Sequence, residues 1–166
     1  TLAAGTIAFF TAEGKAHNVI TTGGVEIAVQ EWADDEKTKP FENLSGVMPN
    51  TTVTKIAEVK NTGASDAWVR VKVEKNIKLQ GEGTPDTGLV ELTLYTPDWT
   101  EKDGYYYYKE ALKPGEVTAP IFTAVTFKPE MGNEYQNATA TVDVSAQAVQ
   151  TANNGDTVMD AKGWPN

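Results

Sequence analysis

The feature that most constrains this chain is a strict alternation of apolar and polar residues along several segments. In the segment from Asp66 to Leu79, one face of the expected strand carries Trp68 and charged residues, and the other carries Val69, Val71, Val73, Ile77 and Leu79. Because successive side chains of a β-strand point to opposite faces, this alternation predicts a half-buried strand. Ala138–Ala148 and the segment around Leu92 show the same pattern. The core positions that follow are Val69, Val71, Val73, Leu92, Leu94, Val142 and Val144.

Turn signals divide the rest of the chain into further short strands, among them Val25–Val29, Val53–Val59 and Ile121–Phe127. Gly23-Gly24 predicts a hairpin between Val19–Thr22 and Val25–Val29. Asp103-Gly104 predicts another, between Trp99–Lys102 and Tyr105–Lys109. Trp32–Asn50 is polar and acidic, so we expect a long connection there, and Asp156 and Gly163 fit the two ends of one short helix. About eight to ten such strands are typical of a β-sandwich or a jelly roll.

Length, composition and charge exclude several kinds of site and disfavour several kinds of partner. The chain has 166 residues, which suits one domain. It has no cysteine, so disulfides, thiolate zinc sites and cysteine nucleophiles are excluded. Its net charge of −9 disfavours nucleic acid and anionic membrane surfaces as partners. No apolar run reaches the roughly 18 residues of a spanning helix.

Residues Thr1–Thr11 form an apolar segment without charge. One interpretation is the remnant of a secretory signal peptide. The other, which we favour, is a β-strand that is apolar on both faces and therefore requires burial on both sides. Such a detached strand would complete an open sheet edge in a neighbouring subunit. In that case the chain divides into a donor strand (1–11) and a single sandwich domain (12–166), and the contact residues are Leu2, Ala4, Ile7, Phe9 and Phe10.

The sequence gives only weak signals for catalytic, metal-binding or sugar-binding residues. The single histidine, His17, cannot build a zinc-protease motif, and we expect it to be structural. Asp34-Asp35-Glu36 offers carboxylate oxygens but lacks the spacing of a known calcium loop. The run Tyr105–Tyr108, with the four tryptophans, could form a sugar-stacking platform, but core packing and cross-strand pairing explain it more simply. We therefore expect no catalytic residue, no cofactor and no metal.

Four stretches of the chain share a recognisable order of motifs: Gly5–Val29, Met48–Val73 with its Asn-Thr-Gly turn, Asp103–Val125 with its tyrosines and Lys-Pro-Gly-Glu turn, and Ala146–Gln150 followed by Gly163-Trp164. Together they resemble the TasA/camelysin family of secreted matrix proteins.

The resemblance implies an all-β, jelly-roll-like antiparallel β-sandwich with long loops and at most one short helix. It also implies export and assembly into extracellular filaments of the biofilm matrix, in which the N-terminal strand of one subunit completes the sheet of the next. The expected partner is another copy of the chain, head to tail, with other matrix components as further candidates. A secreted camelysin-like metallopeptidase and a carbohydrate-binding module remain as alternatives.

Overall fold

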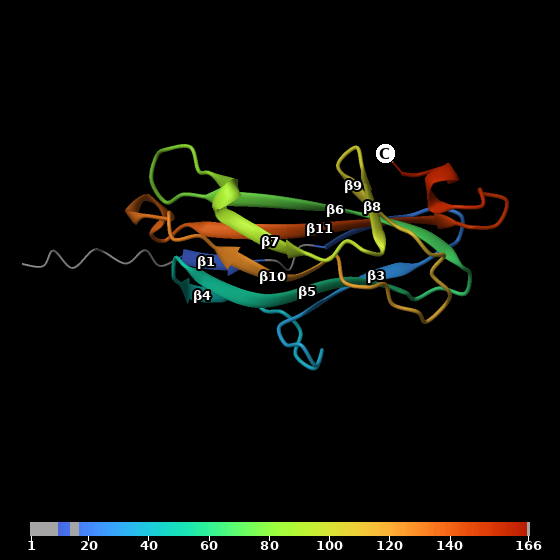
Figure 1. Ribbon diagram of the computed structural model, residues 1–166, viewed down its shortest axis with the longest axis horizontal. Helices are drawn as coiled ribbons and strands as arrows, with labels where there is room; N and C mark the ends of the chain where they lie inside the picture. The colour runs from blue at the N-terminus through green and yellow to red at the C-terminus, as the bar shows by residue number, and fades with distance from the viewer. Residues whose placement is uncertain (1–9, 14–16, 166) are drawn as a thin grey trace, which may run out of the picture.

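The computed structural model describes residues 10–13 and 17–165 as a sandwich of two β-sheets (Figure 1). The first sheet has the order β4-β1-β11-β6-β9-β8, with β2 also on β11. The second has the order β3-β5-β10-β7. Within the described ranges, helical structure is limited to three 3₁₀ turns. The predicted all-β sandwich is thus confirmed. The strands of the first sheet are β1 (Phe10–Glu13), β2 (His17–Thr21), β4 (Leu44–Val47), β6 (Ala67–Lys78), β8 (Trp99–Lys102), β9 (Tyr105–Tyr108) and β11 (Thr139–Gln150). The strands of the second sheet are β3 (Ile27–Trp32), β5 (Thr51–Asn61), β7 (Val90–Leu94) and β10 (Phe122–Phe127). The 3₁₀ turns are Thr87–Leu89, Asn133–Tyr135 and Val158–Asp160.

The pairing of β6 with β11 is the longest in the molecule, because these are the two segments with the longest alternating patterns. The strands run antiparallel and pair at every residue, with Val71 opposite Ala146 and Val73 opposite Val144. On its other side β11 carries β1 and β2, both parallel to it. These two parallel pairings depart from the fully antiparallel arrangement that the sequence predicts.

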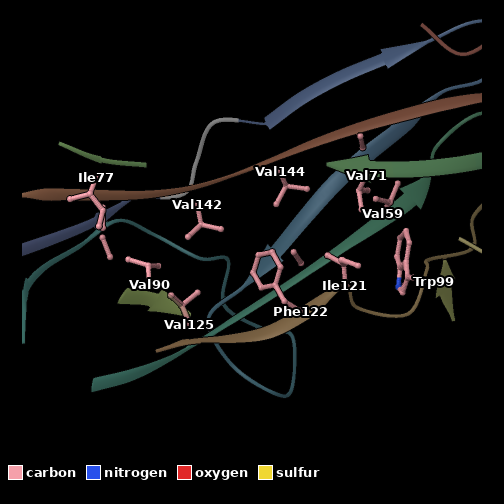
Figure 2. Packing of buried hydrophobic residues seen from close by; sticks show 14 of the residues in the cluster. Val59, Val71, Ile77, Val90, Trp99, Ile121, Phe122, Val125, Val142 and Val144 are labelled. Carbon is pink, nitrogen blue, oxygen red and sulfur yellow. The ribbon is translucent and has the colours of Figure 1, made fainter. Parts of the chain in front are cut away.

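The core lies between the two sheets. Figure 2 shows Val142 and Val144 pointing from β11 toward Val125 and Phe122 of β10. Of the seven predicted core residues, Val69, Val71, Val142 and Val144 are buried, and Val73 and Leu92 are partly buried against the core. The prediction is wrong for Leu94, which is 45% exposed. Leu94 lies at the end of β7, the outermost strand of its sheet, where the two sheets do not close over it.

The two predicted hairpins have different outcomes. Asp103 and Gly104 both have positive φ, 52° and 82°, and join β8 to β9 in a two-residue turn, as predicted. The hairpin at Gly23-Gly24 is wrong, because β2 pairs with β11 in one sheet and β3 pairs with β5 in the other. The two glycines carry the chain from sheet to sheet. A glycine pair signals a reversal of the chain but leaves open which strand each arm pairs with.

Two further expectations need correction. The connection Trp32–Asn50 contains a strand, β4, which the sequence does not reveal because its first three residues are exposed. The helix between Asp156 and Gly163 is only the 3₁₀ turn at Val158–Asp160, which starts after Thr157 and has no side-chain cap from Asp156. A single turn is enough there because its role is to bury Val158.

A buried ion pair joins the strands of the second sheet and reaches the first. Lys55 of β5 lies 2.8 Å from Glu31 of β3, and both side chains are almost fully buried. The Lys55 ammonium also donates to the carbonyl of Val142 in β11 at 3.3 Å and lies 4.4 Å from the ring centroid of Phe41. Burial lowers the pKa of Lys55, and the Glu31 carboxylate opposes that shift. The pair therefore fixes the alignment of three strands across the sandwich.

Val71 is buried and Leu94 is exposed, so replacing each with Asp should change the free energy of unfolding by different amounts. Val71→Asp places a charge in a fully buried position of β6 and should cost more than about 4 kcal/mol of unfolding free energy. Leu94→Asp should stay within about 0.5 kcal/mol of the parent, as surface substitutions do. Urea denaturation measures both. A Val71→Asp protein that melts normally would show that the inward face of β6 is wrongly assigned.

The ion pair predicts a double-mutant cycle. Glu31→Met and Lys55→Met should each cost roughly 3–5 kcal/mol, because each leaves a buried charge without its partner. The double variant should be more stable than either single variant, since two apolar side chains of similar length then replace the pair. Chemical denaturation measures the free energy of unfolding of all three variants. If the loss in the double variant equals the sum of the losses in the two single variants, Glu31 and Lys55 are not directly coupled.

Candidate functional site

One edge of the sandwich is open along most of β6. On the side away from β11, β6 pairs with β9 only at Arg70 and Val71, and an isolated bridge joins Ala67 to Leu112. From Lys72 to Lys78, that side of β6 carries no strand within the described residues. β6 is therefore paired along its whole length on one side and only near its start on the other.

The facing edge of the second sheet is open as well. β7 pairs with β10 along its length and is the last strand of its sheet in the described part of the chain. Figure 1 shows β7 on the same side of the sandwich as β6. Two unpaired strand edges, one from each sheet, therefore flank a single opening.

This opening is a groove, which we call the β6–β7 groove, with a volume of about 390 Å³. Val73 and Tyr106 come from the first sheet, and Leu92 and Leu94 from the second. Burial, with a smaller contribution from Glu101, raises the pKa of Tyr106, so its hydroxyl stays neutral in ordinary buffers. The complete lining is Val73, Lys75, Gly88, Glu91, Leu92, Leu94 and Tyr106.

The groove has the properties of a strand-binding site. Its apolar residues Val73, Leu92 and Leu94 follow the alternating pattern of core residues yet stay partly or largely exposed. An extended segment laid between the strands would cover them and pair with the free backbone edge. From the sequence, these residues are predicted to lie in the core. Alternation shows the direction in which a side chain points, but it cannot show that no strand covers it.

A larger hollow of about 570 Å³ lies beside Phe41, Leu44 and Val53. The loop residues 38–42 form much of its wall. The strand edges beside it are β4, with four residues, and residues 51–55 of β5, which β3 does not cover. Each of these edges is shorter than the seven-residue stretch from Lys72 to Lys78 on β6.

Of the predicted donor-strand residues, Leu2, Ala4, Ile7 and Phe9 lie outside the described residues. Phe10 is described, and it is 2% exposed in its own subunit. Its ring lies 4.8 Å from that of Phe127, and β1 pairs with both β4 and β11 of the same chain. Phe10 therefore anchors the start of the described sandwich, and residues 1–9 lie ahead of this anchor.

The remaining candidate residues, His17 and Asp34, lie in a strand and in a loop of the sandwich. His17 begins β2. The Asp34 carboxylate accepts hydrogen bonds from the Thr38 hydroxyl and the Lys39 backbone, which hold its pKa below the usual range. It thus shapes its own loop. Among residues 10–13 and 17–165, no group of three or more His, Asp or Glu side chains is placed to hold a metal ion.

The tyrosine run divides between two faces of β9. Tyr106 and Tyr108 pack against the core, whereas Tyr105 and Tyr107 lie on the outer face. There the Arg70 guanidinium lies 4.0 Å from the Tyr105 ring centroid and 4.7 Å from that of Trp164. Arg70 also donates to the backbone carbonyl of Pro165 at 3.2 Å.

This outer cluster holds the C-terminal segment against the sheet. Trp68, expected on an exposed face, is buried beneath the segment, and its indole N–H donates to the Asn154 carbonyl at 3.1 Å. Tyr107 and Val158 complete the packing. The chain's own residues therefore fill the aromatic face, and no open stacking platform remains at Arg70.

Comparisons with protein families, with curated proteins and with solved structures find no match. No helix in the described part of the chain is long and apolar enough to cross a membrane.

Proposed function

We propose that this protein is the structural subunit of an extracellular filament of the biofilm matrix, and that residues 1–9 of one subunit bind as a strand in the β6–β7 groove of the next. The observation that carries this proposal is the pair of unpaired strand edges beside partly exposed core residues. Backbone pairing supplies affinity in this mode of binding, and alternate side chains fill pockets.

The dimensions of donor and acceptor agree. A strand rises about 3.3 Å per residue, so nine residues extend over roughly 30 Å. The unpaired stretch of β6 from Lys72 to Lys78 is roughly 23 Å long by the same rise. One copy of residues 1–9 is thus long enough to cover this edge and leave a short connection to Phe10.

The chemistry of the two partners also agrees. Residues 1–9 carry no charged side chain, and both faces of the segment are apolar. Each large side chain that enters the groove, such as Ile7 or Phe9, contributes roughly 1.5–3 kcal/mol. Each backbone hydrogen bond adds roughly 0.5–1.5 kcal/mol net. These contributions oppose the cost of fixing one subunit on another.

The placement of donor and acceptor favours a filament over a closed dimer. The donor segment starts from Phe10 in β1, between β4 and β11, whereas the groove lies beyond β6 in the same sheet. The contact thus joins two different surfaces, and such a head-to-tail contact extends indefinitely unless its rotation closes a ring. The net charge of −9 would keep the filament surface hydrated.

The resemblance of Gly5–Val29 and Asp103–Val125 to the TasA/camelysin family supports export and a place in the matrix. No specific observation supports either alternative function, the metallopeptidase or the carbohydrate-binding module. A peptidase needs a metal or nucleophile arrangement, and a sugar-binding module needs a stacking surface that the chain's own Arg70 does not occupy.

Deletion of residues 1–9 tests the donor. The truncated protein should stay monomeric in sizing experiments and form no filaments in electron micrographs, because the strand that joins subunits is gone. Phe10 must be retained, since its removal would open the core. A synthetic peptide of residues 1–9 should bind the truncated protein and raise its melting temperature. Filaments of normal width from the truncated protein would contradict the proposal.

A charge in the groove tests the acceptor. Leu94→Asp should leave folding nearly unchanged but abolish peptide binding and filament growth, because a carboxylate would be buried against an apolar strand. Val19→Asp is the matched control, since Val19 is similarly exposed, on β2, away from the groove. Equal loss of filaments in both variants would show that the β6–β7 groove is not the acceptor.

A further inference from the structure

A lysine side chain crosses the β6–β7 groove. Lys75 continues the inward-facing row of β6 that includes Val73 and Ile77, and it is half-buried. Its ammonium donates a hydrogen bond of 2.7 Å to the backbone carbonyl of Val90 in β7. A side chain of the first sheet thus occupies a backbone acceptor on the open edge of the second.

We propose that Lys75 is a gate for strand addition, an inference that rests on the proposed function. A strand that enters the groove needs the space that the lysine side chain crosses and the carbonyl that its ammonium occupies. Inward-pointing charges are a known means of protecting open sheet edges from unwanted pairing. Lys75 therefore opposes addition of residues 1–9 until its ammonium leaves the Val90 carbonyl.

The neighbouring residues give the displaced ammonium a place to go. Glu91 follows Val90, lines the same groove and has a side chain that is 59% exposed. The carboxylate also lies 3.1 Å from the Lys128 ammonium, so it already binds a cation at the surface. A lysine stem stays against apolar surface while its charge moves to water, and this lets Lys75 swing toward Glu91 without leaving β6.

The gate slows association but does not forbid it. The subunit then persists as a monomer at low concentration, where its two open edges would otherwise favour premature pairing. Strand insertion proceeds only where the gain in burial and backbone pairing exceeds the loss of the bond from Lys75 to Val90.

The experiment compares three full-length variants with the parent protein. Lys75→Met keeps the length of the side chain and removes its charge and donor. Lys75→Arg keeps both charge and donor. Lys102→Met is the control for charge, because Lys102 is exposed on β8, outside the groove, and its loss changes the net charge equally, from −9 to −10. Dilute monomers of each are titrated with a fluorescent peptide of residues 1–9, and filament growth is followed by light scattering.

We expect Lys75→Met to bind the peptide about tenfold more tightly than the parent and to form filaments with a shorter lag, since one charge-assisted hydrogen bond no longer has to break. Lys75→Arg and Lys102→Met should behave as the parent does. Equal affinity and lag in Lys75→Met and the parent, with binding intact, would overturn the gate and leave the groove as acceptor. Absence of peptide binding to every variant would overturn both proposals, because no strand would enter the groove.

Discussion

The antiparallel pairing of β6 with β11 is the interaction on which the rest of the structure depends. Each strand has twelve residues, and they pair at every position. Their inward side chains, such as Val71 and Val144, form one wall of the core. Because β1 and β2 cover the far side of β11, this strand lies inside its sheet. Among the described residues, no strand covers the corresponding side of β6 beyond Val71, and this difference between β6 and β11 leaves the groove open.

Polar contacts connect the two sheets inside the core and also at the open β6–β7 side. Inside the core, Lys55 pairs with Glu31 and reaches the backbone of β11, so a buried charge connects the sheets. On the open side, Lys75 reaches the backbone of β7 from a half-buried position. Both lysines bond a carbonyl of the opposite sheet. Lys55 cannot leave, because it is surrounded by core, whereas Lys75 has solvent beside it.

In the filament that we propose, each subunit would have to balance its own folding against assembly. Exposed Leu94 and partly exposed Val73 and Leu92 lower the stability of the isolated chain, because apolar surface that could be buried is left in water. In the proposed assembly, burial of the same surface would drive the binding of a second chain. On the outer face, Arg70 holds the C-terminal segment over Trp68 and Tyr107, so the aromatic residues there are already covered and do not compete with the groove.

The sequence by itself determines most of the strands, with β4 as an exception, and it determines to which face of a strand each side chain points. The alternation at Val69 and Val71 and the Asp103-Gly104 turn depend only on local geometry, so β6 and the β8–β9 hairpin are predictable from neighbouring residues. The tertiary structure alone decides which strand lies beside which. It places β2 and β3 in different sheets despite the Gly23-Gly24 turn, covers Trp68 and leaves Leu94 exposed. It also brings Lys75 to Val90, fifteen residues away in the chain. The physical reason is that a two-residue period fixes only the direction of a side chain, whereas its burial depends on the strand or segment that packs against it, from a distant part of the sequence.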